Sequence, residues 1–275
     1  MTIPVPLYDA FSAQYDYFVD WAQRLRHEMP FIERHLVGAG ARRVLDVACG
    51  TGKHALALAQ SGYEVVGADL SVGMIEQARK NAAAFGDPIR FVVAGFGNQC
   101  DTVGGGFDAL LCLGNSLPHV LSTHALMATL ADFGAVLRPG GLLLIQSRNF
   151  DAVMRGRVRW IGPQSHPLAG TGDYRKQGDH PLAGTGDYRE WLFVRFYDFN
   201  PDGTLTFNVL SLQRETTGPW SQRAEATTLR PWLRHELQQS IESAGFAGCV
   251  CYGGMEGAPF DAACSSDLVI VAFKV

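Results

Sequence analysis

VLDVACGTG at residues 44–52, followed by a helical pattern and by VVGAD at residues 65–69, decides the fold class of this chain. The first stretch is an apolar run that ends in a glycine-rich turn, and the second is a β-branched run that ends in an acid. A strand, a turn, a helix and a second strand in this order are typical of a βαβ unit on a parallel sheet. Because glycines carry no side chain, a ligand can approach the backbone of the turn and the first amides of the helix.

The same alternation continues along the chain and predicts an α/β fold with a mostly parallel sheet of seven strands. The strands are expected at residues 44–48, 64–69, 89–94, 109–113, 142–146, 249–252 and 267–274. The helices between them are expected at residues 53–61, 71–84, 124–137 and 231–244. A glycine or a Pro-Gly-Gly run would end the helices at 53–61, 124–137 and 231–244.

Two segments fall outside this alternation. Residues 8–34 have the pattern of one or two amphipathic helices, and residues 191–213 have the pattern of two strands joined by a turn at residues 200–203. They divide the chain into an N-terminal helical cap (1–40), a cofactor-binding core (41–150 and 231–275) and a lid insertion that contains a β-hairpin (151–230).

The lid insertion contains an internal duplication. HPLAGTGDYR occurs at residues 166–175 and again, identically, at residues 180–189. Two copies do not make a solenoid, and a tract rich in glycine and polar residues is typical of a loop. We expect a partly disordered surface extension and assign no chemistry to it.

Composition and charge exclude several classes of partner. The chain has 275 residues, a formal net charge of -4 and 18% charged residues, which argues against binding nucleic acid or anionic lipid through bulk electrostatics and favours a small molecule. It begins without the pattern of a secretory signal, and no stretch approaches the roughly 18 apolar residues of a membrane span, so a cytoplasmic location is expected. The six cysteines include no CxxC pair; we expect reduced thiols and assign no metal site.

The glycine-rich turn is compatible with more than one ligand. A phosphate-cradling loop is excluded because Val47 and His54 stand where it needs glycine and Ser/Thr. A dinucleotide loop of the G-x-G-x-x-A form remains open on spacing alone. Asp46, ahead of Gly50, would place a carboxylate under the ligand, which suits a cationic amino acid end better than a pyrophosphate and favours S-adenosylmethionine. Asp69, at the end of the second strand, would accept hydrogen bonds from ribose hydroxyls.

The motifs also resemble a known family. DVACGTG with the acid of the second strand is similar to the Rossmann-like class I methyltransferases, over residues 43–150 and 231–275. FDALLCLGNSLPH at residues 107–119, and RPGGL at residues 138–142 continuing to RNFD at residues 148–151, resemble the glycine and sarcosine N-methyltransferases.

The resemblance implies a role for individual residues in binding the cofactor. The turn from Gly50 to Gly52 would hold the methionine moiety above Asp46, Asp69 would bind the ribose, and Met74 would pack near the adenine. The N-terminal segment with Tyr8, Tyr15 and Tyr17 would close over the cofactor. The full set of expected cofactor-binding residues is Asp46, Ala48, Cys49, Gly50, Gly52, Asp69, Leu70, Met74, Gly95, Phe96 and Leu113.

The resemblance also implies that Asn115 and Arg148 contact an amino acid substrate. Both follow strand ends at the carboxyl edge of the predicted sheet, where open α/β sheets bind ligands, and the planar fork of Arg148 suits a carboxylate. His119 is a candidate base for a nucleophile that arrives as an ammonium ion. The lid stretches carry Trp160 and Phe207, not the tyrosines with which glycine-specific enzymes close their pocket, so glycine itself is not assigned as the acceptor.

We therefore expect S-adenosylmethionine-dependent methyl transfer to a small-molecule amine, of the carboxylated glycine or sarcosine type, with S-adenosylhomocysteine as the product. The alternatives are a different oxygen or nitrogen nucleophile, an NAD-dependent oxidoreductase, and a module that binds the nucleoside without turnover. The sequence does not decide the acceptor, the number of methyl groups transferred, or whether the chain is a monomer or a homo-oligomer.

Overall fold

The computed structural model describes residues 12, 15–16, 19–86, 89–168, 189–215 and 218–275. Its larger sheet has seven strands in the order β10-β11-β5-β4-β1-β2-β3, so the predicted seven-stranded sheet is confirmed. The strands are β1 (Arg43–Val47), β2 (Glu64–Asp69), β3 (Arg90–Val93), β4 (Phe107–Cys112), β5 (Leu137–Arg148), β10 (Phe246–Tyr252) and β11 (Asp267–Lys274).

Most of the sheet is parallel. β1 pairs in parallel with β2 and β4, and β2–β3 and β4–β5 are also parallel, whereas β11 runs antiparallel to both β5 and β10. The strand order reverses between β1 and β4, because successive strands are added on opposite sides of β1. Open α/β sheets bind ligands at the carboxyl ends of the strands on either side of such a reversal.

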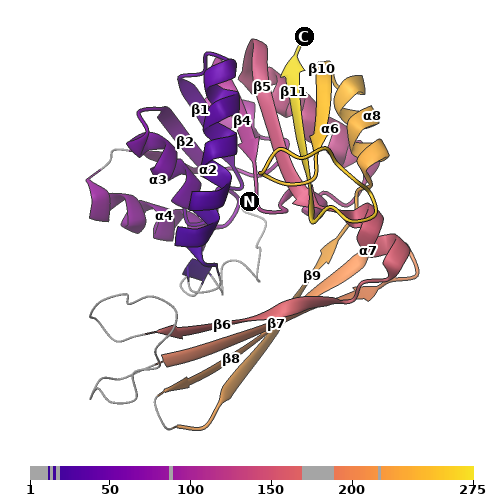
Figure 1. Cartoon of the computed structure of the whole chain (residues 1–275). Helices are drawn as coiled ribbons and strands as arrows, with labels where there is room; N and C mark the ends of the chain where they lie inside the picture. Colours follow the sequence, from indigo (N-terminus) through magenta and orange to yellow (C-terminus); the bar gives the residue numbers. More distant parts are fainter. Residues whose placement is uncertain (1–11, 13–14, 17–18, 87–88, 169–188, 216–217) are drawn as a thin grey trace.

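Helices cover both faces of this sheet (Figure 1). One buried cluster joins it to the helices on one face, and a second cluster joins it to those on the other, where Leu130 and Ile241 come from the covering helices. The first face is covered by α2 (Trp21–Gly38), α3 (Lys53–Gln60) and α4 (Val72–Phe85), and the second by α6 (Thr123–Val136) and α8 (Arg234–Ser243). Shorter helices follow strand ends: α5 (Gln99–Val103), η1 (Leu117–His119) and α7 (Phe150–Gly156).

A second sheet lies beyond the carboxyl edge of the first (Figure 1). It is antiparallel in the order β6-β7-β8-β9, with β6 (Trp160–Leu168), β7 (Arg189–Phe199), β8 (Leu205–Glu215) and β9 (Ser221–Leu229). β7 and β8 are the predicted hairpin, whereas β6 and β9 were not predicted. The sequence of β6 contains a glycine and two prolines, and β9 is polar and mostly exposed, so neither shows the apolar alternation of a half-buried strand.

The duplicated tract is described only at its two ends. Residues 166–168 end β6 and Arg189 begins β7, where Leu168 pairs with Arg189, so these residues belong to strands and not to the surface loop that we expected. Residues 169–188, which make up the rest of the tract, lie outside the described residues, and the expected disorder stays a prediction.

The second sheet is anchored to the first by packing and by hydrogen bonds. Phe150 of α7 is buried against Tyr197, Leu205 and Leu229 of the second sheet. After β9, the chain returns to the core, where the indole of Trp232 donates to the carbonyl of Val120 at 2.9 Å. The second sheet therefore has a fixed position opposite the strand ends. In the described part of the chain, no helix is long and apolar enough to cross a membrane.

Candidate active site

A cavity of about 820 Å³ opens at the carboxyl ends of β1, β2 and β3. Seven of the expected cofactor-binding residues lie on its wall: Ala48, Gly50, Asp69, Leu70, Met74, Gly95 and Phe96. We call it the nucleoside cavity. Its lining fits the expected adenosine site, because the carboxylate of Asp69 stands at the end of β2 and the ring of Phe96 stands in the loop after β3.

Asp69 is held in place by backbone amides. Its Oδ2 accepts a hydrogen bond from the amide of Gly50 at 2.8 Å, and its Oδ1 accepts one from the amide of Ser71 at 2.9 Å. Gly50 has a φ of 55° and the preceding Ala48 a φ of 52°, a left-handed conformation that is costly for alanine. The strained turn brings the amide of Gly50 to the carboxylate, and this amide together with that of Ser71 fixes the orientation of Asp69.

Four expected residues do not line the cavity, and packing explains their positions. Gly52 has a φ of 75°, and a Cβ there would lie 2.8 Å from the ring of Phe91, so its missing side chain makes room for core packing and not for a ligand. Cys49 and Leu113 belong to the same buried cluster as Phe91. That these three residues contact the cofactor stays a prediction.

Asp46 is the fourth residue. Asp46 is 2% exposed and is absent from the cavity wall, and its expected place beneath the ligand stays a prediction. Its Oδ2 has no hydrogen-bond partner among the described residues. Burial, followed by the charge of Asp69, raises the pKa of Asp46 to about 8, against a smaller opposing effect of Arg24. A buried carboxylate without a partner is one that a nearby positive charge would stabilise.

Gln99, at the start of α5, is a cavity residue that the sequence analysis missed. It is fully buried, and its Nε2 donates to the carbonyl of Gly95 at 2.9 Å. Its Oε1 has no hydrogen-bond partner in the described part of the chain. The carbonyl fixes which way the amide points, so Gln99 keeps a buried acceptor oxygen without a described partner in the lining of the nucleoside cavity. The sequence does place Gln99 shortly after a predicted strand and its Gly-Phe-Gly loop, which could have indicated a residue at the cofactor site.

A second cavity of about 790 Å³ lies between the strand ends and the antiparallel sheet. Its wall includes all three expected catalytic residues, Asn115, His119 and Arg148, so the structure brings them together. We call it the acceptor cavity. Tyr15, Gly114 and His119 line both cavities, and the two therefore meet at the turn after β4.

That turn is shaped by two left-handed residues and by contacts to β5. Gly114 and Asn115 have φ values of 70° and 66°. The side-chain oxygen of Asn115 accepts hydrogen bonds from the amide of Arg148 at 2.9 Å and from the hydroxyl of Ser147 at 3.1 Å. Asn115 thus ties the ends of β4 and β5 together, which leaves its amide NH2 as the part that can reach a ligand.

The acceptor cavity has an excess of positive charge on one side. Arg148 lies 3.8 Å from Asp267, which is a long ion pair, and its charge lowers the pKa of the nearby Tyr197 against the larger raising effect of burial. Arg195 of β7 lies on the same wall, and burial together with the nearby Arg148 lowers its pKa. Two guanidinium groups near each other favour an anionic ligand between strand β5 and the second sheet.

His119 does not have the properties of the proposed base. Burial lowers its pKa to about 4, so its imidazole is neutral near neutral pH and has little affinity for a proton. A general base works best when its pKa is near the working pH. The position of His119 at the junction of the cavities agrees with a contact to a ligand, whereas its pKa argues against a role as proton acceptor.

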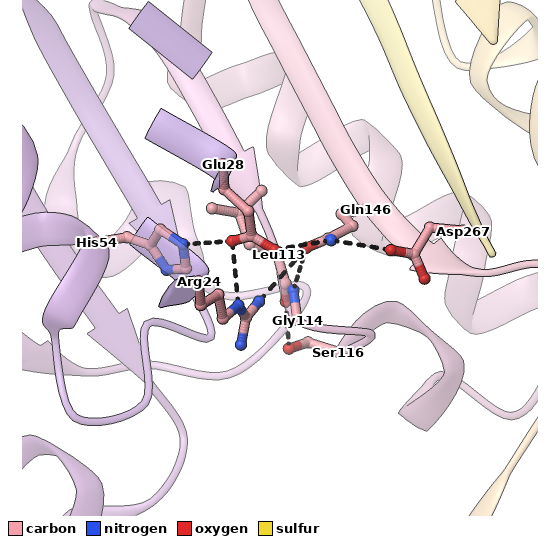
Figure 2. Close-up of polar contacts among 8 residues, drawn as sticks. All are labelled: Arg24, Glu28, His54, Leu113, Gly114, Ser116, Gln146 and Asp267. Atoms are coloured by element: carbon pink, nitrogen blue, oxygen red, sulfur yellow. Dashed lines mark hydrogen bonds and ion pairs between the residues drawn. The ribbon is translucent and has the colours of Figure 1, made fainter. Parts of the chain in front are cut away.

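A buried polar network fixes the junction from the side of α2 (Figure 2). Glu28 pairs with His54 at 2.7 Å and with the Nε of Arg24 at 3.0 Å, and it accepts from the side chain of Gln146 at 3.0 Å. Gln146 in turn accepts from the amide of Gly114 at 3.1 Å. Burial alone would raise the pKa of Glu28, but the hydrogen bond from His54 and the charge of Arg24 lower it to about 2.

The network was not predicted, although α2 carries a signal for it. Arg24 and Glu28 are four residues apart, and Glu28 stands on the face of α2 that also buries Phe31 and Ile32. A charged residue on a buried helix face usually has a charged partner in the core. Tyr15 lies on both cavity walls, whereas Tyr8 and Tyr17 lie outside the described residues. Within the described part of the chain, no group of His, Cys, Asp and Glu side chains could hold a metal ion.

Comparisons with known proteins agree with this geometry. A family described as methyltransferase domain matches residues 44–141. The glycine/sarcosine N-methyltransferase of Halorhodospira halochloris is 32% identical over 209 residues, which cover 76% of this chain and 74% of that protein. The glycine/sarcosine N-methyltransferase of Parasynechococcus marenigrum is 38% identical over 146 residues, 53% of this chain and 52% of that protein. The solved structure of the CcbJ methyltransferase from Streptomyces caelestis has a TM-score of 0.71 at 23% identity over 98% of both chains, which shows a shared fold.

Proposed function

Because this chain belongs to the class I S-adenosylmethionine-dependent methyltransferases, and is related to the glycine/sarcosine N-methyltransferases, we propose that it methylates a small-molecule amine that carries a carboxylate. S-Adenosylmethionine is its methyl donor and S-adenosylhomocysteine its product. The family membership removes the NAD-dependent oxidoreductase from the alternatives. We also propose that the enzyme works in the cytoplasm.

The observation that carries the proposal is the junction of the two cavities. The nucleoside cavity holds an oriented carboxylate, Asp69, and the acceptor cavity holds the guanidinium of Arg148. They meet at Tyr15, Gly114 and His119, where a donor from one side and an acceptor from the other would come into contact. Bringing two reactants together in a defined orientation lowers the barrier by up to about 7–11 kcal/mol.

The residues of the nucleoside cavity fit an adenosyl group. Asp69 would accept hydrogen bonds from the ribose hydroxyls, the ring of Phe96 would pack against the adenine, and Gln99 would offer its free oxygen to an amino group. Asp46 would stabilise the positive charge from beneath the wall. When bound, S-adenosylmethionine supplies a methyl group on a sulfonium, which is already an activated electrophile, so the protein needs to position the acceptor and to exclude water.

The acceptor is proposed from the charges of the second cavity. Arg148 would bind the carboxylate, with Arg195 increasing the positive potential, and the amide NH2 of Asn115 would orient the substrate. The cavity of about 790 Å³ is at the upper end of the range of about 300–1,000 Å³ that is typical of drug-sized ligands. Its wall includes apolar side chains of the second sheet, among them Phe207 and Val209. A carboxylated amine larger than glycine is therefore the second candidate acceptor.

The test is transfer of radiolabelled methyl from S-adenosylmethionine to glycine, sarcosine and larger amino acids. Arg148→Gln should raise KM for carboxylated amines by about 10- to 100-fold, the effect of one charge-assisted hydrogen bond. Arg159→Gln is the matched control, because Arg159 pairs with Asp198 at 2.7 Å and lines neither cavity. An unchanged KM in Arg148→Gln would show that the carboxylate does not bind at Arg148.

A further inference from the structure

Asp267 is a carboxylate on the wall of the acceptor cavity that the proposed function does not yet use. It begins β11, directly opposite Arg148 in the pairing of β11 with β5. Its side chain is 25% exposed, and it does not line the nucleoside cavity. A ligand group that contacts Asp267 would therefore belong to the methyl acceptor and not to the cofactor.

The contacts of Asp267 leave its charge poorly compensated. Its Oδ1 is 3.8 Å from Arg148. Its Oδ2 accepts from the side chain of Gln146 at 3.4 Å, a contact that Figure 2 shows. Charge-assisted hydrogen bonds usually span about 2.7–2.9 Å, so both contacts are weak. A cationic ligand group could approach this carboxylate without displacing a strong native partner.

Two other carboxylates line the acceptor cavity, and both form short hydrogen bonds or ion pairs within the protein. Glu28 binds Arg24, His54 and Gln146 at 2.7–3.0 Å. Asp20 is the N-cap of α2 and accepts from the amide of Gln23 at 2.9 Å. Among the three carboxylates of the described wall, Asp267 is the one without a hydrogen bond or ion pair shorter than 3.4 Å from its side chain.

We propose that Asp267 is a catalytic residue that binds the amine of the acceptor and takes its proton, while Arg148 binds the carboxylate. This inference rests on the proposed function. The proton moves from the ammonium nitrogen to a carboxylate oxygen of Asp267, and the nitrogen keeps its electron pair. That pair forms the new nitrogen–carbon bond as the carbon–sulfur bond breaks and its pair returns to the sulfur. Asp267 then releases the proton to water.

The proton affinity of Asp267 agrees with this role. Burial raises its pKa above the ordinary value, and Glu28 of α2 acts in the same direction. Arg148 and Gln146 of β5 and Arg24 of α2 act in the opposite direction, and Tyr197 of β7 also faces the group. An acid with a raised pKa is a better proton acceptor than an ordinary aspartate.

The test is a titration calorimetry experiment on protein saturated with S-adenosylhomocysteine, using three probes of similar size. Sarcosine has an amine and a carboxylate, N-methylethanolamine has the amine without the carboxylate, and methoxyacetate has the carboxylate without the amine. Asp267→Asn should weaken sarcosine and N-methylethanolamine by about 10- to 100-fold and leave methoxyacetate unchanged or tighter. Arg148→Gln should weaken sarcosine and methoxyacetate and leave N-methylethanolamine unchanged.

Loss of carboxylate binding in Asp267→Asn would overturn the inference. If Asp267→Asn weakened methoxyacetate as much as sarcosine, Asp267 would only position Arg148. Asp267→Glu, which keeps the carboxylate, should recover part of the affinity for both amines. In the methyl-transfer assay, the acid limb of kcat/KM against pH should be present in the wild type and lost in Asp267→Asn; a limb that persists would show that another group takes the proton.

Binding of S-adenosylhomocysteine separates this inference from the rest of the account. Asp267 lies outside the nucleoside cavity, so unchanged affinity for S-adenosylhomocysteine shows that Asp267→Asn is folded. If the wild type binds S-adenosylhomocysteine and none of the three probes, the acceptor class and the role of Asp267 both fall while the cofactor site stands. If it binds the probes and only the Asp267→Asn pattern fails, the proposed function survives without this residue.

Discussion

Replacing Asp46 by asparagine should stabilise the cofactor-free protein at neutral pH and weaken its binding of S-adenosylmethionine. Asp46 is buried, and its pKa is raised from 3.8 to about 8 in the folded chain. Between these two values the folded chain keeps a proton that the unfolded chain has released. Stability is therefore lost as the pH rises through this window, and the loss is complete above about pH 8.

The size of the effect follows from the two pKa values. At pH 7 the solution is about three units above the unfolded value, and each unit corresponds to about 1.4 kcal/mol, so the loss is at most about 4 kcal/mol. Asparagine carries no charge at any of these pH values and escapes this loss. Its free energy of unfolding should exceed that of the wild type by a large part of this amount at pH 7. At pH 5, about 1.2 units above the unfolded value, the difference should be at most about 1.7 kcal/mol.

The assay is urea unfolding of the cofactor-free protein at pH 5, 6, 7 and 8. Asp101→Asn, which removes an exposed carboxylate from α5, is the control for a general change in net charge. Wild type and Asp46→Asn should converge toward acid pH and diverge toward alkaline pH. If both lost stability in parallel over the whole range, the buried carboxylate would not be the source, and the argument for its stabilisation by a cationic cofactor would fail with it.

Three further predictions concern the cavities and their support. Gln99→Leu should weaken S-adenosylhomocysteine about tenfold in titration calorimetry and leave the 6-oxo analogue S-inosylhomocysteine less affected; equal losses would exclude recognition of the amino group. Gly52→Ala should cost about 2–4 kcal/mol in urea unfolding, because its Cβ would meet Phe91 in a left-handed backbone, whereas Gly38→Ala, with open space around it, should not destabilise the chain. Glu28→Gln should cost about 3–5 kcal/mol, measured in the same way, because it leaves buried partners uncompensated; a loss below about 1 kcal/mol would contradict the network.

The sheet could be predicted from the sequence because its strands are nearly continuous apolar runs. β1 and β4 are buried almost throughout and are bounded by glycine turns, so their patterns cannot be mistaken for surface elements. The hairpin β7–β8 was found from its turn and its alternating residues. β6 and β9 were missed because edge strands need little apolar surface, so their sequences show no clear strand pattern. Their strand structure is evident only from their pairing with β7 and β8.

Residues of the site could be predicted where one sequence motif contains both the residue and the neighbours that position it. Asp69 and Gly50 belong to one strand-turn-helix-strand unit, and both were expected at the cofactor site and line the nucleoside cavity. Asp267 and Glu28 come from the two ends of the chain, and only the tertiary structure brings them to the same cavity. Gly52 has a second reason that the motif does not show, because a Cβ at this position would meet the side chain of Phe91, far along the sequence.

The central claim is that the donor and the acceptor occupy two cavities that meet at the turn after β4. A crystal structure with S-adenosylhomocysteine and sarcosine bound tests it most directly. We expect the sulfur of S-adenosylhomocysteine at the junction formed by Tyr15, Gly114 and His119. The carboxylate of sarcosine should lie against Arg148 and its nitrogen beside Asp267. A sulfur placed away from this junction, or sarcosine bound outside the acceptor cavity, would contradict it.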